Sequence, residues 1–417
     1  MGVRLPRLED LVTDCRLCGA PLRVTFADLG LSPVANEYVT DPQAPERVYP
    51  LHAYVCESCL MVQLGMIVDQ EEIFSPEYAY FSSYSDSWVD HARRYVEMMA
   101  ERFGYSAESK VIEVASNDGY LLQFFVERGV PVLGIEPTAG TAAAAEERGV
   151  PSRVEFFGNE LATRLVEEGE AADLVIGNNV LAHVPPVHDF VEGLRVVLKP
   201  GGVVTMEFPH LLKLIEEREF DTIYHEHYSY WSLLVVERLF GEHGLALFDV
   251  EELPTHGGSL RIFARHAEEG GSGDAVEALK ERERVAGLDR IETYQAFGES
   301  VRAVKRDLLE FLVGVKRDGK SVAGYGAAAK GTTLLNYCGI RSDFVDYVVD
   351  RNPHKQGTWL PGVRLPIHAP EHVAETRPDY LLILPWNIAA EITEQMAHIR
   401  EWGGQFVVPI PSVRVLS

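Results

Sequence analysis

The sequence predicts an α/β protein with two open parallel sheets and a small metal-binding module in front of them. Residues 110–265 alternate between short apolar segments and amphipathic segments, a pattern typical of parallel strands joined by covering helices. A second unit of this kind, with a glycine-rich turn, begins near Lys320. Two Cys-x-x-Cys pairs near the beginning of the chain predict the metal-binding module.

The composition indicates a large globular chain. Of its 417 residues, 46% are hydrophobic and 24% charged, and roughly 100–200 residues per domain makes about three domains the expectation. The net charge of −25 argues against nucleic acid or an anionic membrane as a partner, because like charges repel. No apolar stretch reaches the roughly 18 residues of a membrane span, and residues 1–14 lack the apolar run of a secretory signal. We therefore expect a cytoplasmic protein.

The cysteine spacing predicts a structural zinc site. Cys15 with Cys18, and Cys56 with Cys59, can each hold two corners of a tetrahedron around Zn²⁺. Disulfides and free core thiols are the alternatives, but disulfides are rare in a reducing cytosol. Four thiolates leave no open coordination position, so we expect no catalytic role for this site. Cys338 stands alone and is expected to be a core thiol.

The remaining elements follow from local patterns. Residues 47–55 predict a strand of the zinc module, and one helix face within residues 66–105 carries Trp88, His91, Ala92, Tyr95 and Val96. The polar and aromatic run 78–84 suits a lid or pocket wall, although a packed loop explains it nearly as well. Further strands are expected at 110–114, 132–136, 172–177, 202–207, 321–323, 344–349 and 380–384, and helices at 119–127, 139–148 and 187–198.

These elements group into five segments. We expect a zinc-binding domain, a helical or lid connector, a central α/β domain, a charged helical connector and a second α/β domain, at residues 1–65, 66–105, 106–268, 269–315 and 316–417.

The first strand-to-helix turn of the central domain points to a cofactor. Glu113 lies in the strand, and Ala115, Ser116, Asn117 and Gly119 follow in the turn, at the edge where open α/β sheets bind ligands. Glu136 ends the next strand, where a carboxylate can accept hydrogen bonds from ribose hydroxyls. A dinucleotide site normally has three glycines here, and this turn has one. A cationic cofactor without phosphates, such as S-adenosylmethionine, fits better, and a Rossmann-like fold with another ligand is the alternative.

This central block resembles the class I S-adenosylmethionine-dependent methyltransferases. The matching motifs are the run 113–119, Glu136-Pro137, Asn178-Asn179 after the fourth strand, and the turn 198–202. Ala115 and Ser116 depart from the commoner glycines of the first motif. The resemblance implies a class I methyltransferase, Rossmann-like domain whose cofactor-binding residues are Glu113, Ala115, Ser116, Asn117, Gly119, Glu136, Pro137, Asn178 and Asn179.

The whole chain resembles the sugar C-methyltransferases of antibiotic deoxysugar pathways. The matching blocks, from first to last, are Cys56–Leu64, Tyr80–Ser83, Ser116–Gly119, Tyr224–His227, Thr255–Arg261, Gly324–Lys330, Asp350–Gln356 and Pro385–Asn387. The resemblance implies an N-terminal zinc-binding domain, a central methyltransferase domain and a C-terminal Rossmann-like domain. It also implies a nucleotide-linked 4-keto deoxysugar as substrate, usually carrying thymidine diphosphate, which is methylated at C-3 beside the ketone.

Methylation at carbon needs a base and a group that polarises the ketone. By resemblance His227 is the candidate base, while Glu226 can orient an imidazole or bind sugar hydroxyls and Tyr224 can donate to the enolate oxygen. His183 follows Asn178-Asn179 and is the second candidate acid or base. Tyr80, with Tyr78 as the alternative, can close the site. A lone histidine is more often structural, and His225-x-His227 can also be read as two metal ligands, although no third ligand is evident nearby.

The C-terminal turn is expected to hold the nucleotide. Gly324-x-Gly326 permits close backbone approach, and Lys330 adds a positive charge for a diphosphate. Lys355 and Arg261 are further candidates, Asp350 can bind a ribose or base edge, and the matched blocks add His256, Gly258 and Tyr325. Helix packing by small residues is the alternative reading of this turn.

Other functions stay open at this point. A nicotinamide-dependent oxidoreductase would use the second turn, but it leaves the 116–119 and 224–227 clusters without a role. A non-catalytic zinc-linked scaffold leaves the ionisable cluster at 224–227 unexplained, and O- or N-methylation can use the same histidine. We expect the chain to act as a monomer.

Overall fold

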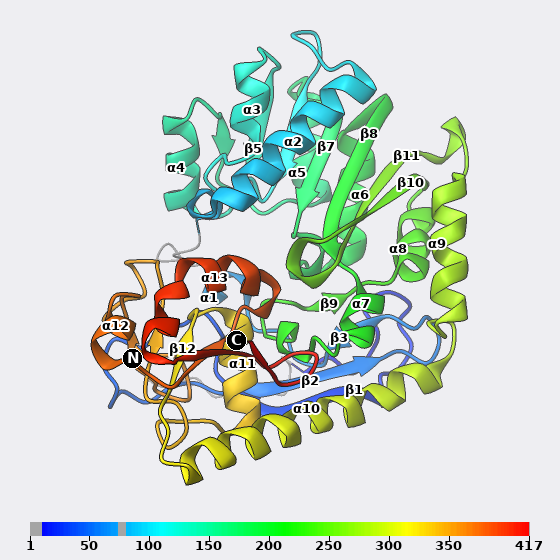
Figure 1. The fold of residues 1–417 in the computed structure, drawn as a ribbon. Coiled ribbons are helices and arrows are strands. Elements are labelled where there is room, and N and C mark those ends of the chain that lie inside the picture. Colours follow the sequence, from blue (N-terminus) through cyan, green and yellow to red (C-terminus); the bar gives the residue numbers. More distant parts are fainter. Residues whose placement is uncertain (1–10, 74–80, 417) are drawn as a thin grey trace.

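Three sheets organise the chain (Figure 1), and the computed structural model describes residues 11–73 and 81–416. The seven-stranded sheet and its helices occupy the upper part of Figure 1, and the other two sheets lie in the lower part beside the long helix α10 (Ile291–Arg317). None of the helices in the described ranges combines the length and apolar character of a membrane span. The predicted α/β class with two parallel-sheet units is confirmed.

The central sheet has the strand order β10-β11-β8-β7-β4-β5-β6. Its five strands from β8 to β6 are parallel, and β10 and β11 form an antiparallel extension on β8. The inner strands are almost wholly apolar because helices cover both faces. The strands are β4 (Val111–Val114), β5 (Val132–Ile135), β6 (Ser152–Arg153), β7 (Ala172–Asn178), β8 (Leu198–Pro209), β10 (Leu245–Leu253) and β11 (Ser259–His266).

Two separate cores line the faces of this sheet. One core contains side chains of α5, α6 and α8, and the other contains side chains of α2, α3 and α4. Helix α2 buries Ala92, Tyr95, Val96 and Met99, the expected face, and Ser85 caps its first turn. The helices are α2 (Asp86–Phe103), α3 (Leu122–Glu127), α4 (Ala139–Glu147), α5 (Asn159–Glu167), α6 (Val187–Val197) and α8 (Leu233–Glu242).

The N-terminal sheet includes one strand from the middle of the chain. Its antiparallel order is β1 (Val24–Ser32), β2 (Tyr49–Val55), β3 (Val62–Leu64) and β9 (Ser229–Tyr230). Helix α10 packs on β1, where the rings of Phe26 and Phe297 stack with centroids 4.4 Å apart. Because β9 follows residues 224–228 directly, the N-terminal sheet holds that segment in place.

The C-terminal sheet has the order β14-β13-β12-β15-β16-β17, and only β17 is antiparallel to its neighbour. The strand predicted over 344–349 is wrong in its first four residues, because only Val348 and Val349 pair with β12. The strands are β12 (Val322–Tyr325), β13 (Val348–Val349), β14 (Ile367–His368), β15 (Tyr380–Ile383), β16 (Gln405–Val408) and β17 (Arg414–Leu416). The remaining helices are α1 (Gln70–Ile73), α7 (Leu211–Glu216), α9 (Asp274–Val285), α10, α11 (Ala329–Cys338), α12 (His372–Thr376) and α13 (Ala389–Gln395).

Candidate active site

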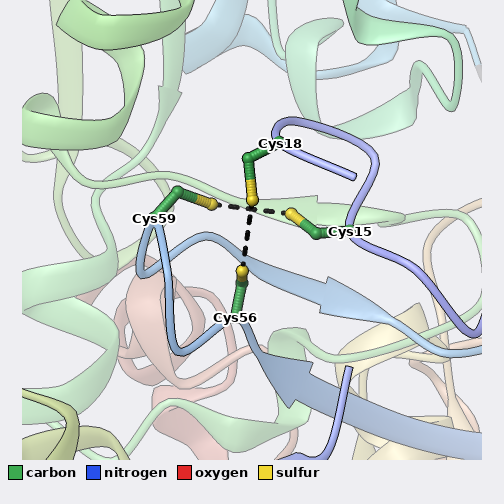
Figure 2. A group of neighbouring side chains, drawn as sticks. All are labelled: Cys15, Cys18, Cys56 and Cys59. Carbon is green, nitrogen blue, oxygen red and sulfur yellow. Dashed lines mark hydrogen bonds between the residues drawn. The ribbon is translucent and has the colours of Figure 1, made fainter. Parts of the chain in front are cut away.

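The four predicted metal ligands converge on one point (Figure 2). The sulfur atoms of Cys15, Cys18, Cys56 and Cys59 all lie within 4.8 Å of one another. A zinc–sulfur bond of about 2.3 Å gives a tetrahedron with edges of about 3.8 Å, so the four thiolates fit Zn²⁺. None of these cysteines forms a disulfide, and Gln63 donates a hydrogen bond to Cys15 Sγ over 3.0 Å. Cys338 is buried in the C-terminal core, as expected.

The turn after β4 adopts an unusual backbone. Ala115, Asn117 and Gly119 all have positive φ angles, of 56°, 49° and 75°. Ala115 therefore keeps the left-handed conformation for which glycine is usually chosen. The helix expected from residue 119 starts at Leu122 instead, because this turn continues through 119 before α3 begins.

Acidic and amide side chains surround this turn. The Glu136 carboxylate accepts hydrogen bonds from the backbone N–H groups of Asn117 (3.0 Å) and Thr138 (2.9 Å), and Pro137 lies in the same turn. Burial raises the pKa of Glu113 well above its usual value. In the part of the chain that the structure describes, neither polar atom of the buried Asn178 amide has a hydrogen-bond partner. A buried amide without partners at the end of β7 fits a polar ligand at this edge of the sheet.

The segment before α2 packs on the same turn. The backbone N–H of Ser82 donates to Asn117 Oδ1 over 2.8 Å, and Ser83 hydrogen-bonds Asp118, which also pairs with Arg148. The ring of Tyr84 stacks on His354 of the C-terminal domain. The described part of the predicted lid thus connects the cofactor turn with that domain. The candidates Tyr78 and Tyr80 lie outside the described residues.

A neutral histidine lies at the centre of the 221–228 segment. His227 Nδ1 lies 2.9 Å from the carbonyl oxygen of Thr222, which can only accept, so Nδ1 carries the proton. Its Nε2 atom lies 2.8 Å from the hydroxyl oxygen of Tyr224 and accepts a hydrogen bond from that hydroxyl. Burial, reinforced by the neighbouring His183, holds the pKa of His227 well below its usual value.

His183 lies beside this pair. Its ring meets the His227 ring edge to face, with centroids 4.7 Å apart, and burial lowers the pKa of His183 to about 4. His225 points elsewhere, since its buried ring packs against Tyr49. Among the residues described, the four cysteines are the only cluster suited to a metal, which removes the reading of His225-x-His227 as a metal pair.

Glu226 faces a cavity between the N-terminal and C-terminal domains. The amide nitrogen of Asn36 donates to both Glu226 oxygens, over 2.8 and 2.9 Å, and burial raises the pKa of Glu226 to about 7. The cavity has a volume of about 1020 Å³. Its walls include the predicted substrate-binding residues Tyr325, Asp350 and Lys355, along with Asn36, Tyr38, Arg47, Tyr84, Glu226, Arg351 and His354.

Four predicted substrate-binding residues do not line this cavity: His256, Gly258, Arg261 and Lys330. Arg261 of β11 forms ion pairs with Glu207 (2.9 Å) and Glu251 (3.0 Å), which does not support the predicted contact with a phosphate. Gly258 serves a backbone turn with a φ of 136°. Lys330 lies outside the cavity walls and donates a hydrogen bond to the His256 carbonyl oxygen, so its expected contact with a diphosphate stays a prediction. The glycines near it support helix packing, since a Cβ at Gly331 would lie 2.8 Å from Leu384.

Several residues of the site escape sequence reasoning. Asn36 holds Glu226, Glu207 joins His91, Thr255 and Arg261, and Asp221 accepts a hydrogen bond from Trp386. Asn36 and Glu207 belong to no recognisable motif, because Glu226 and Arg261, the charged groups that they bond, are distant in sequence and only the fold brings them together. Trp386 belongs to a matched block, which was its only signal.

The fold and the cofactor turn together define a class I methyltransferase with a Rossmann-like central domain. Three families match consecutive parts of the chain: "Putative zinc binding domain" at residues 15–74, "Methyltransferase domain" at 89–250 and "C-methyltransferase C-terminal domain" at 254–411. The chain is 36% identical to C-methyltransferase NovU of Streptomyces niveus, over 98% of this chain and 99% of that protein. The chain therefore belongs to the C-methyltransferase family, and it is an S-adenosylmethionine-dependent enzyme with a zinc-binding module.

Other relatives match a smaller part of the chain. The ubiquinone biosynthesis O-methyltransferase of Rhodopseudomonas palustris strain BisB18 is 26% identical over 28% of this chain and 46% of its own length. Among solved structures, the magnesium protoporphyrin IX methyltransferase of Synechocystis PCC 6803 is 14% identical, covers 43% of this chain and 83% of its own, and aligns with a TM-score of 0.34.

One glycine outside the motif is expected to control the cofactor turn. A Cβ at Gly134 in β5 would lie 2.4 Å from Ser116 Oγ, so Gly134→Ala must displace the turn. Overpacking of about 1–3 kcal/mol corresponds to about 5- to 150-fold in affinity if it acts on the cofactor turn, and we expect at least about fivefold weaker binding of S-adenosylmethionine by calorimetry. Gly241→Ala, in a helix with nothing within 4 Å, is the matched control and should bind normally. Equal affinities in the two variants would contradict the expected role of this turn.

Proposed function

We propose that the enzyme methylates C-3 of a nucleotide-linked 4-keto deoxysugar, as a step of antibiotic deoxysugar biosynthesis. The observation that carries this proposal is the arrangement of His227, whose unprotonated Nε2 atom is hydrogen-bonded by Tyr224 near the carboxyl edge of the methyltransferase sheet. A histidine that stays neutral can accept a proton from a carbon acid at neutral pH.

The chemistry divides among three residues. S-adenosylmethionine, when bound, supplies the electrophilic methyl group. His227 Nε2 takes the proton from C-3, and the electron pair of that C–H bond moves toward the ketone oxygen to form an enolate. Tyr224 turns from His227 to donate to that oxygen, so its hydroxyl stabilises the charge where it develops. His183, packed on the base and neutral, is the second candidate for holding the proton.

The geometry of the turn supports the proposed cofactor-binding roles. Glu136 retains lone pairs for ribose hydroxyls beyond the two backbone bonds it accepts. Asn178 offers both a donor and an acceptor, and Glu113 lies below the turn. The left-handed residues Ala115, Asn117 and Gly119 shape the backbone around which Ser116 packs. These positions support S-adenosylmethionine at the end of β4 and β7.

The cavity supports a nucleotide diphosphate handle, with thymidine diphosphate as the proposed form. Asp350 accepts hydrogen bonds from the backbone N–H groups of Ala327 and Asn352, over 2.8 Å each, the same pattern that Glu136 shows in the central domain. Lys355 lies 3.7 Å from Asp350, and Arg351 is a second cation in the cavity wall. Glu226, in the wall of the same cavity, can accept a sugar hydroxyl.

The direct test uses S-adenosylmethionine with a ¹³C-labelled methyl group and a thymidine-diphosphate-linked 4-keto deoxysugar. A product whose labelled methyl carbon couples to a sugar carbon in the NMR spectrum is expected. Label attached to oxygen or nitrogen would show O- or N-methylation and overturn the assignment of C-3. Consumption of NADH without methyl transfer would favour the oxidoreductase reading.

A further inference from the structure

The loop at residues 255–258 lies between the methyltransferase sheet and the C-terminal domain, and its backbone is strained. His256 has a φ of 56°, and Gly257 and Gly258 follow at 101° and 136°. A non-glycine residue in this conformation persists only where surrounding contacts enforce it, and such residues gather at functional sites. The contacts on each side of the loop therefore show what it does.

The methyltransferase side connects the loop to the end of β7. The Asn179 side-chain nitrogen donates to His256 Nε2 over 2.8 Å, and Asn179 itself has a positive φ of 55°. The hydroxyl of Thr255 donates to the buried Glu207 carboxylate over 2.9 Å, and the backbone of Glu207 accepts from Asn179 over 2.7 Å. The loop and the cofactor edge of the sheet thus share one hydrogen-bond network.

The C-terminal side is held by Lys330 of α11. Its Nζ atom donates to the His256 carbonyl oxygen over 3.2 Å and to Asn387 Oδ1 over 3.1 Å, and it lies 4.3 Å from the Trp386 ring centre. The Trp386 indole in turn donates to Asp221 over 2.8 Å. The absence of a side chain at Gly257 is required here, since a Cβ would lie 2.3 Å from Glu219 Oε1 and 2.6 Å from Trp386.

The charges around Lys330 explain why a lysine is suited to this place. Burial lowers the pKa of Lys330, and the charges of the buried carboxyls Asp221 and Glu219 oppose that shift. Burial raises the pKa of Asp221 to about 6 and that of Glu219 to about 8, while Lys330 opposes both shifts. The ammonium therefore compensates acids inside the interface instead of facing the cavity.

We propose that Lys330 is a positioning residue for the cofactor site: it holds the 255–258 loop so that His256 keeps Asn179 in place at the end of β7. The C-terminal domain then completes the binding of S-adenosylmethionine in addition to holding substrate. This proposal does not depend on the identity of the sugar.

The test is a double-mutant cycle on cofactor affinity. We expect Lys330→Met and His256→Ala each to weaken S-adenosylmethionine binding about tenfold by calorimetry, and the double variant to lose no more than either single variant, because both act through one contact chain. Thymidine diphosphate binding should keep its wild-type affinity in Lys330→Met. Lys305→Met is the matched control, because Lys305 also bonds a backbone carbonyl and lies over an aromatic ring, at α10, away from the site.

Each other outcome is decisive. Unchanged S-adenosylmethionine affinity in Lys330→Met would overturn the proposal, as would additive losses in the double variant or an equal loss in Lys305→Met. A selective loss of thymidine diphosphate would restore the phosphate-binding role instead. If Lys330→Met fails to fold in thermal melting, normal cofactor affinity of His256→Ala overturns the proposal by itself. Failure of the wild-type protein to bind thymidine diphosphate would count against the proposed substrate and leave the cofactor measurement intact.

Discussion

Replacing His227 by asparagine is expected to lower the rate of methyl transfer by about 10²–10⁴-fold, the range that a positioned general base contributes. Asparagine can still donate to the Thr222 carbonyl but has no basic nitrogen to replace Nε2. Cofactor affinity should stay within a few-fold of wild type, because His227 belongs to a different part of the site from the turn at 115–119. A large loss of both rate and cofactor affinity would point to a structural role.

The proton-transfer step can be measured without the methyl donor. In deuterated water, the wild-type enzyme is expected to exchange the C-3 proton of the sugar nucleotide, and His227→Asn is expected to abolish the exchange. His225→Asn is the matched control, two residues away with its ring against Tyr49, and should retain exchange. Exchange that persists in His227→Asn but disappears in a His183→Asn variant would transfer the role of base to His183.

Removal of zinc is expected to unfold the N-terminal sheet. Structural zinc contributes apparent binding free energies of about 10–16 kcal/mol in zinc-finger peptides, as large as the total stability of a typical domain, which is about 5–15 kcal/mol. Cys56→Ser should therefore bind less than a tenth of the wild-type zinc and lose strand signal in circular dichroism. Because β9 belongs to this sheet and directly follows residues 224–228, methyl transfer should fall as well.

The fifth cysteine provides the control for that experiment. Cys338 is buried in a different hydrophobic core from the zinc ligands, so Cys338→Ala should keep one zinc per chain and most of the activity. Elemental analysis gives the stoichiometry, and thermal unfolding gives the stability. A Cys56→Ser protein that retains both its zinc and its melting temperature would contradict the four-thiolate site.

The chemistry of the site was partly visible in short motifs and partly not. The turn at 115–119 and the segment 224–227 are each a continuous run of residues. Their residue types alone therefore predict a cofactor turn and an acid–base cluster. The roles of Lys330 and Arg261 could not be predicted, because a positive side chain near a glycine-rich turn can face either a ligand or a buried acid. The buried acids beside these cations are Glu207 for Arg261 and Asp221 for Lys330, and each acid is distant in sequence from its cation.

By itself, the sequence determined the α/β class, the zinc ligands and the cofactor turn, because each depends on periodicity or spacing within a few residues. The five predicted segment boundaries stay a prediction. Only the tertiary structure decided that β9 joins the N-terminal sheet, that Asn36 holds Glu226, and that Lys330 supports the His256 loop. The physical reason is that ion pairs and hydrogen bonds between distant segments depend on how whole domains pack, and no local pattern records that packing.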